Sequence, residues 1–276
     1  TRDFIDGVVV NGHLGELFLE SHGVVFSPET ARINEFSVKN TDVSLTLENM
    51  EDTDTTTAEP IYWKILLDEI DFENVGFALN MPQDSLFVRT MLPKTTLKDG
   101  VIDLKEASYY VKSFDMDNAE LAYGPKEELS LKKIGLQLDS IYYCGRDIRA
   151  NIEEFVFKER SGLELVSTEG RIASDSVLIQ IPKFTMKTTA SSLDLQTKIG
   201  WNVLEMKKTG ALSARINAEI GKGDVVKILG GRDTLFLQTY PNKPFVFRAD
   251  TEGDLNRLRL RTLEAGLAKA FELKAE

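Results

Sequence analysis

Residues 43–48 have the sequence Val-Ser-Leu-Thr-Leu-Glu, in which apolar and polar side chains alternate at every step. Successive side chains of a β-strand point to opposite faces of the sheet, so this alternation predicts a strand with one apolar face and one polar face. Leu45 and Leu47 then lie together on the apolar face. The stretch therefore predicts a sheet that presents hydrocarbon on one side and polar groups on the other.

The same period-two pattern recurs in short runs along residues 1–276. Turn-forming pairs such as Asn11-Gly12, Ser27-Pro28 and Asp99-Gly100 separate the runs. Short turns join antiparallel neighbours, because a parallel pair needs a crossover of about a dozen residues or more. We therefore predict an all-β chain of about sixteen to twenty strands, forming one continuous, elongated and curled antiparallel sheet with a taco-like or bridge-like groove.

The apolar positions of these runs are the candidate lining of the groove. They share the alternating spacing, so we expect them to face one side of the sheet and to contact the same ligand. The candidates are Leu45, Leu47, Phe72, Phe77, Leu79, Ile102, Leu104, Leu136, Leu138, Phe155, Phe157, Val177, Ile179, Leu193, Leu195, Leu235, Leu237, Phe245, Phe247, Leu258 and Leu260.

Few segments depart from the strand pattern. Residues 225–229 are mainly apolar and lie between Asp224 and Gly230, which predicts a helix of about two turns with Asp224 as its cap. We expect at most one or two short helices in the chain. Residues 48–60 are acidic and have almost no large apolar side chains, so we predict a mobile loop there. The tail at 263–274 fits a helix or a strand, and we favour a strand.

Composition excludes several classes of protein. The formal net charge is -11 and the pI is near 4.9, whereas a nucleic-acid-binding protein normally carries a basic face, so we expect no nucleic-acid partner. Cys144 is the only cysteine, so no internal disulfide can form. Apolar runs such as residues 8–10 are far shorter than the roughly 20 residues that a membrane-spanning helix needs. Residues 1–7 show neither a signal peptide nor an anchor, so we expect the sequence to be cut from a longer protein.

No motif predicts catalysis, a metal site or a cofactor. The carboxylates between Asp68 and Glu73 alternate with apolar residues, which is typical of a solvated strand face. His13 and His22 are the only histidines, and they have no metal-ligand spacing. Gly221-Lys222-Gly223 lacks the further residues of a phosphate-binding loop. We therefore expect a protein that is not an enzyme.

A long sheet with one apolar face must close, form a sandwich or curl to cover that face. A curled, open sheet leaves an apolar strip uncovered, which promotes aggregation unless an apolar ligand occupies it. Acyl chains fit such a strip. The pattern therefore favours a lipid-binding groove.

Four segments resemble one known family. They are FVFKERSGLEL at 155–165, VLIQIPKFTMKTTASSLDL at 177–195, and the stretches 101–123 and 244–258. Together they are similar to the AsmA-like TamB proteins (translocation and assembly module) of the Bacteroidota. The matching motifs specify strand and turn spacing and contain no reactive group.

The resemblance implies a periplasm-spanning protein of the Gram-negative cell envelope, anchored to the inner membrane by a segment outside this sequence. It implies that this sequence is an interior fragment of that protein. It implies a sheet that shields the acyl chains of phospholipid between the inner and outer membranes, and thereby supports outer-membrane biogenesis and protein secretion. It also implies an outer-membrane barrel of the Omp85 type as a partner, bound by regions outside this sequence.

Two other hypotheses for the fold and function remain open. An extracellular or cell-surface module made of tandem β-sandwiches would recognise glycan or protein through loops such as 48–60, and it would have two separable cores. A β-helix polysaccharide lyase would need a regular short repeat, which the sequence lacks. Two stable halves after limited proteolysis would favour the sandwich module, whereas phospholipid that co-purifies with the protein would favour the groove.

The elongated sheet predicts a large radius of gyration. Sixteen to twenty strands at about 4.8 Å spacing form a sheet roughly 75 to 95 Å long. A compact chain of the same number of residues has a radius of gyration of about 19 Å. We expect small-angle X-ray scattering to give a radius clearly above the compact value. A radius at the compact value would exclude the extended sheet.

Overall fold

The computed structural model describes residues 2–5, 8–47, 62–124, 126–205, 210–230, 234–254, 256–268 and 270–275. These residues form sixteen strands and three short helices. The strands are β1 (Arg2–Ile5), β2 (Val8–His13), β3 (Glu16–Phe26), β4 (Glu29–Leu47), β5 (Lys64–Met81), β6 (Leu86–Asp103), β7 (Ser108–Tyr123), β8 (Leu129–Cys144), β9 (Asp147–Glu159), β10 (Glu164–Ser174), β11 (Leu178–Thr188), β12 (Ser192–Gly200), β13 (Leu212–Ile220), β14 (Phe245–Gly253), β15 (Leu258–Leu267) and β16 (Phe271–Ala275). The helices are α1 (Trp201–Leu204), α2 (Lys222–Leu229) and α3 (Thr234–Thr239).

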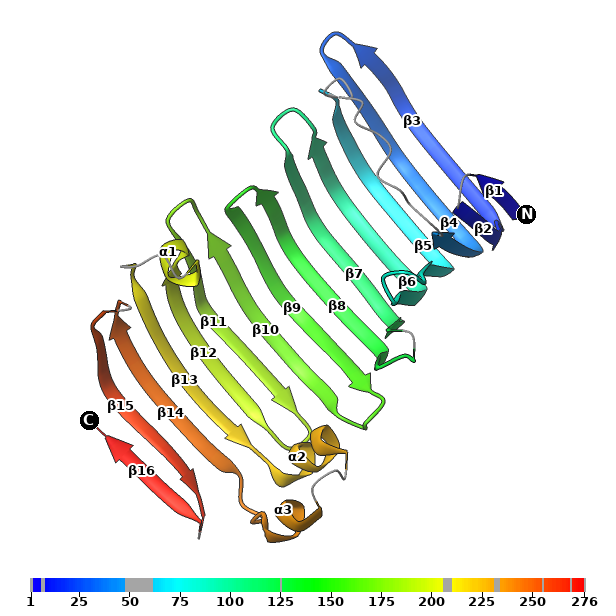
Figure 1. Ribbon diagram of the computed structural model, residues 1–276. Coiled ribbons are helices and arrows are strands. Elements are labelled where there is room, and N and C mark those ends of the chain that lie inside the picture. The colour runs from blue at the N-terminus through cyan, green and yellow to red at the C-terminus, as the bar shows by residue number, and fades with distance from the viewer. Residues whose placement is uncertain are drawn as a thin grey trace. The chain divides into compact units, whose positions relative to one another are not determined.

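The chain forms two compact units, Thr1–Gln137 and Leu138–Glu276, and β8 contributes residues to both. In the first unit the hydrogen-bonded order is β1-β2-β4-β5-β6-β7-β8, with β3 also paired to β4. In the second unit the order runs from β8 to β16 without interruption. Its helices lie at the ends of the strands, with α1 at one end and α2 and α3 at the other (Figure 1). The predicted all-β class, an open and curled antiparallel sheet, is confirmed.

One pair departs from the predicted meander. Strands β4 and β5 are parallel, and Phe36 and Val38 on β4 lie beside Ile70 and Phe72 on β5. The connection between them, residues 48–63, is long enough for the crossover that a parallel pair needs. The predicted mobile loop at 48–60 falls in this connection and lies outside the described residues.

Residues with left-handed backbone interrupt the strands of the first unit. Asn40 on β4 and Asn74 on β5 have φ values of 50° and 54°, a conformation that asparagine tolerates better than most residues. Asn74 Nδ2 donates a hydrogen bond of 3.3 Å to Asn40 Oδ1, so the two asparagines are joined side by side. The other non-glycine residues of this kind within strands of the first unit are Asp99, Asn118 and Lys133.

The hydrogen-bond ladder passes over these positions without a change of register. Between β5 and β6, Glu73 pairs with Lys94, and the ladder skips Asn74 and Pro93 before it resumes. Proline has no N–H to donate, so it fits where the ladder makes no bond. We call such a position a corner, defined by a left-handed residue inside a strand.

Corners change the spacing of the apolar residues. In a strand that keeps one face apolar, the two apolar residues on either side of a corner are therefore three positions apart in the sequence, whereas elsewhere they are two apart. On β5 the apolar series is Ile65, Leu67, Ile70, Phe72, Val75, Phe77 and Leu79, which advances by three at Asp68, beside the corner residue Asp99 of β6, and again across the corner at Asn74.

The contacts around Gly100 indicate the direction in which the sheet bends at the corner of Asp99. Its position follows the corner residue Asp99, and a Cβ there would lie 3.2 Å from both Leu67 Cβ and Leu97 Cδ2. Apolar side chains from both sides of the corner therefore converge, and the sheet bends toward its apolar face. Val38 on β4 and Thr95 on β6 lie on this face, directly opposite Phe72 of β5, and are only 8% and 4% exposed.

β-Bulges have the same effect in the second unit. Ile181 on β11 lies opposite Thr197, whereas Phe184 lies opposite Leu195, and the register shifts between them. A bulge adds one residue to one strand, so side chains three positions apart reach the same face. The apolar face of β12 is thereby continued on β11.

Four details of the sequence prediction need correction. Neither Asn11-Gly12 nor Asp99-Gly100 forms a turn: the first pair lies inside β2, and the second lies inside β6, where Asp99 is a corner residue. There are three short helices, one more than the upper limit that we expected. Helix α2 ends at Gly230 as predicted, but Gly221 is its N-cap and Asp224 lies in the first turn. The tail is stranded as predicted, in β15 and β16, whereas residues 234–239 are helical.

The corner at Asn74 makes a prediction about stability. Replacing Asn74 with Val places a β-branched residue at φ 54°, which costs about 1–2 kcal/mol. Asn74→Gly is the control, because it removes the same hydrogen bond and accepts this backbone. We expect urea denaturation to give a lower free energy of unfolding for Asn74→Val than for Asn74→Gly. Equal values would show that the corner imposes no backbone requirement.

Candidate functional site

The second unit has a continuous apolar face. Residues that lie directly opposite one another on successive strands form rows across the sheet. One row contains Met186, Leu193, Ala218, Phe247, Ala265 and Leu273. The next contains Phe184, Leu195, Ile216, Ala249, Leu263 and Ala275.

The opposite face of the same strands is charged. Arg215 lies beside Asp250, with Nη2 2.9 Å from Oδ2, and Arg248 lies beside Glu264, with Nη1 2.8 Å from Oε2. These pairs join neighbouring strands and are partly solvent-exposed, so each contributes roughly 0.2–1 kcal/mol. The sheet of the second unit therefore has one hydrocarbon side and one ionic side.

The apolar face is not covered by a second layer of described residues. Leu258, Phe271 and Leu273 are 53%, 53% and 52% exposed. The accessible surface of the protein is 18001 Å², compared with about 12,000 Å² for a compact monomer of the same mass. The excess is expected when apolar side chains that would fill a closed core remain open to solvent.

The first unit repeats this division. Leu45, Leu79 and Val88 lie beside one another on β4, β5 and β6, and the rings of Phe36 and Phe72 meet edge to face with centroids 6.4 Å apart. Apolar side chains from neighbouring strands therefore gather on one side.

Cross-strand ion pairs occupy the other side of the first unit. Lys98 Nζ lies 2.9 Å from Glu69 Oε1, and the hydrogen bond to Glu69 raises the pKa of Lys98 above its ordinary value. Asp68 is joined to Arg32 at 3.0 Å and Glu73 to Lys39 at 3.3 Å. The carboxylates at 68–73 are thus placed as the sequence predicted, on a solvated face.

Most of the predicted groove residues lie within strands. The structure brings together Leu193, Leu195, Phe245, Phe247, Leu258, Leu260 and Ile179 on the apolar face of β11 to β15. Phe155 and Phe157 lie on β9, with ring centroids 5.3 Å apart. In the first unit, Leu45, Leu47, Phe72, Phe77, Leu79 and Ile102 lie on β4, β5 and β6. Leu136 and Leu138 lie on β8.

Four predicted groove residues are placed differently. Leu235 and Leu237 lie on helix α3, because Leu-Phe-Leu is a continuous apolar run and carries no true alternation. Leu104 lies in the turn after β6. Val177 lies in the bend before β11 and is 67% exposed, because the Asp175 carboxylate accepts hydrogen bonds from the N–H groups of Val177 and Leu178. The N–H of Val177 is the largest cause that lowers the pKa of Asp175.

Sequence reasoning also missed residues of the apolar face. Ala218, Ala249 and Ala265 connect the larger side chains, but alanine gives little hydrophobic signal. Met186 and Leu263 lie beyond bulges, so strict alternation with Ile181 and Leu260 places them on the wrong face. A search for apolar residues spaced by three positions as well as by two would have identified Met186 and Leu263.

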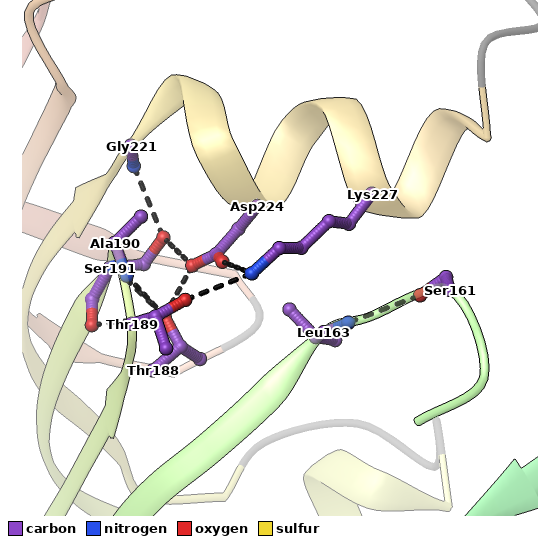
Figure 2. A network of polar contacts seen from close by, with 9 residues as sticks. All are labelled: Ser161, Leu163, Thr188, Thr189, Ala190, Ser191, Gly221, Asp224 and Lys227. Atoms are coloured by element: carbon purple, nitrogen blue, oxygen red, sulfur yellow. Dashed lines mark hydrogen bonds and ion pairs between the residues drawn. The ribbon is translucent and has the colours of Figure 1, made fainter. Parts of the chain in front are cut away.

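A cluster of polar side chains joins the β11–β12 turn to helix α2 (Figure 2). Asp224 is 2% exposed, and its Oδ2 accepts hydrogen bonds from the hydroxyls of Thr188 and Ser191, the latter at 2.6 Å. Ser191 Oγ also accepts a hydrogen bond of 3.1 Å from the N–H of Gly221. Lys227 Nζ lies 3.8 Å from Asp224 Oδ1. The cluster fixes α2 against the end of the sheet.

Comparison with known proteins identifies no relative, because neither a protein-family model nor a curated protein matches the chain. Among the residues that the structure describes, no helix has the length and apolar character needed to cross a membrane. Within the same residues, no group of three or more His, Cys, Asp and Glu side chains is arranged to hold a metal ion.

The Asp224 cluster predicts a stability effect. Asp224→Ala leaves two hydroxyls and an ammonium group without their shared partner in a buried position, which costs about 2–4 kcal/mol. We expect a clear fall in the urea midpoint of the transition that unfolds this unit. Asp194→Ala, which removes an exposed carboxylate from β12, is the control, and an equal fall in both variants would contradict the assigned role.

Proposed function

We propose that this chain is a non-enzymatic lipid-binding and lipid-transport segment whose apolar sheet faces shield the acyl chains of phospholipid. The observation that supports the proposal most directly is the uninterrupted apolar face of β11 to β16, which is open to solvent and backed by an ionic face. No residue acts as a nucleophile or general acid in this function. The protein supplies a surface, and the lipid supplies the second layer.

The physical basis is burial of hydrocarbon on both partners. Each methylene that leaves water contributes about 0.8 kcal/mol, so an acyl chain laid along the face gains several kcal/mol and covers exposed leucine and phenylalanine side chains. The two rows of described residues named above contain no polar side chain that would fix a glycan or a peptide in register. Acyl chains need no such partner, because the interaction is non-directional.

The resemblance to AsmA-like TamB proteins supports the same function and suggests its place in the cell. On that basis we propose a periplasmic segment of a Gram-negative cell-envelope protein that carries phospholipid between the inner and outer membranes. Anchoring to the inner membrane and binding to an Omp85-type barrel are assigned to regions outside this sequence. Support of outer-membrane biogenesis and protein secretion follows from that role.

The alternative, a cell-surface module of tandem β-sandwiches, requires two facing sheets in each unit. The described residues of each unit form a single sheet. We therefore favour the lipid-binding function. Ligand identity is the property that separates the two proposals.

Lipid recovery tests the proposal. In a triple variant, Phe155, Leu193 and Phe247 are each replaced by Asp, which places three carboxylates on the apolar face. We expect the unchanged protein, purified without detergent, to retain phospholipid detectable by mass spectrometry. The variant should retain at least about tenfold less, because an acyl chain cannot solvate a carboxylate.

The matched control adds the same charge to the ionic face. Thr185, Gln196 and Asn217 lie on that face, and replacing each with Asp leaves the apolar rows unchanged. We expect the control to retain lipid like the unchanged protein. Equal recovery from both triple variants, or no phospholipid in the unchanged protein, would rule out the apolar face as the binding surface.

A further inference from the structure

Two rows of residues cross the second unit at the end of the sheet near α1. Lys198, Ser213, Glu252 and Arg259 lie directly opposite one another on β12 to β15, on the ionic face. The adjacent and last row contains Ile199, Leu212, Gly253 and Leu258, on the apolar face. The charged and apolar faces of the sheet therefore meet at this edge.

A pocket of about 470 Å³ lies at this edge. Leu178, Ala211 and Leu212 form its apolar wall. Lys198, Arg257 and Arg259 form its charged rim together with the carboxylate of Glu252. The pocket thus combines hydrocarbon and positive charge.

The β14–β15 turn fixes one of these cations in place. The carboxylate of Asp254 accepts a hydrogen bond of 2.9 Å from the backbone N–H of Arg257, and the Asp254 N–H donates one of 3.1 Å to the Arg257 carbonyl. Gly253 has φ 145°, and a Cβ there would lie 2.0 Å from the Arg257 carbonyl oxygen. Only glycine allows the chain to turn this tightly. Arg257 is therefore held at the pocket by its backbone, and its guanidinium is left to bind elsewhere.

The charge at this edge is opposite to that of the chain. Lysine and arginine side chains outnumber aspartate and glutamate around this pocket and around a second pocket that shares Lys198, Ser213 and Glu252 with it. The chain as a whole, in contrast, carries a net charge of -11. The two acids are already engaged: Asp250 pairs with Arg215 at 2.9 Å, and Arg261 donates to Glu252 and holds its pKa below the ordinary value. Each carboxylate is thus paired with an arginine outside the charged rim, and the charge of Arg259 makes only a smaller contribution to lowering the pKa of Glu252.

Three cations consequently have no carboxylate within ion-pair distance among the described residues. They are Lys198, Arg257 and Arg259. Like charges held close together repel each other, and an anion placed between them removes that repulsion. The planar guanidinium of arginine matches phosphate oxygens in particular, because two parallel N–H groups can bind two oxygens.

We propose that Lys198, Arg257 and Arg259 bind the phosphate head group of a phospholipid whose acyl chains lie on the adjacent apolar face. This inference rests on the proposed lipid-binding function and extends it by placing the head group at one edge of the sheet. The ligand has an anionic head and a hydrocarbon body, which are the two chemistries that meet at the pocket. Arg257 and Arg259 bind the phosphate oxygens, and Leu212 and Leu258 contact the start of the acyl chains.

Calorimetric titration of the full chain tests the head-group site with three probes. These are dihexanoyl phosphatidic acid, dihexanoylglycerol, which has the same acyl chains and no phosphate, and inorganic phosphate alone. At low salt we expect phosphatidic acid to bind about tenfold more tightly than dihexanoylglycerol, because each partly exposed ion pair contributes modestly. This preference should decline at high salt. Inorganic phosphate should bind much more weakly than either lipid.

Two triple variants complete the experiment. Replacing Lys198, Arg257 and Arg259 with Ser should remove the tenfold preference and leave the affinity for dihexanoylglycerol unchanged. The control replaces Arg160, Arg171 and Lys187 with Ser, which removes the same charge from the second unit away from the pocket and should keep the preference. Circular dichroism with equal thermal midpoints establishes that both variants are folded.

The outcomes separate the inference from the proposed function. Absence of binding by both lipids would overturn the lipid-binding function and the head-group site together. Equal affinity for the two lipids, or an equal loss of preference in both triple variants, would overturn the head-group site alone. Binding of inorganic phosphate as tightly as phosphatidic acid would assign the pocket to free phosphate and likewise overturn the head-group site.

Discussion

Most of the described strands keep their apolar side chains on one face of the sheet, and the placement of corners, bulges and ion pairs follows from that constraint; β3 is an exception, because Leu17, Phe18 and Leu19 are consecutive and all exposed. A slip of one residue would send a strand's leucines to the ionic face and its charges to the apolar face. The corners and bulges would each cause such a slip if the sequence alternated strictly. The sequence avoids it by advancing three residues at these points, as between Ile181 and Phe184.

The ionic face adds a second constraint on register. Oppositely charged residues lie beside one another on neighbouring strands, as in Glu69 with Lys98 and Arg248 with Glu264. Each pair is weak in solvent, but a shift by one position would remove both attractions and place apolar residues opposite the charges, such as Leu97 opposite Glu69 and Leu263 opposite Arg248. Hydrophobic pattern and charge pattern therefore specify the same alignment. A single-layered sheet needs both, because no facing sheet is present among the described residues to select the register.

The fold class was predictable because alternation is a local property that survives in each run of five or six residues. The parallel β4–β5 pair was not, because it depends on where a long connection leads. Corners were also missed: Asp99-Gly100 has the composition of a turn, and only the neighbouring strands show that the ladder continues past it. The residues of the candidate site likewise divide into those that local alternation predicts and those that depend on the neighbouring strands. Leu193 and Phe247 were predictable from alternation, whereas Ala218 became part of the face only through its cross-strand neighbours.

A sheet without a second layer gains little from a conventional core, and this accounts for the distribution of buried groups. Many of the most buried positions are small or polar, such as Ala119 and Asp224 at 1% and 2% exposure, and only a few large apolar side chains, such as Leu165 and Ile134, are buried as well. Large side chains remain half-open along the apolar face. Their unrealised burial, at about 25 cal/mol per Å², is available to any ligand that covers them. The features that leave the sheet incomplete as a closed domain are therefore the same ones that suit it to binding hydrocarbon.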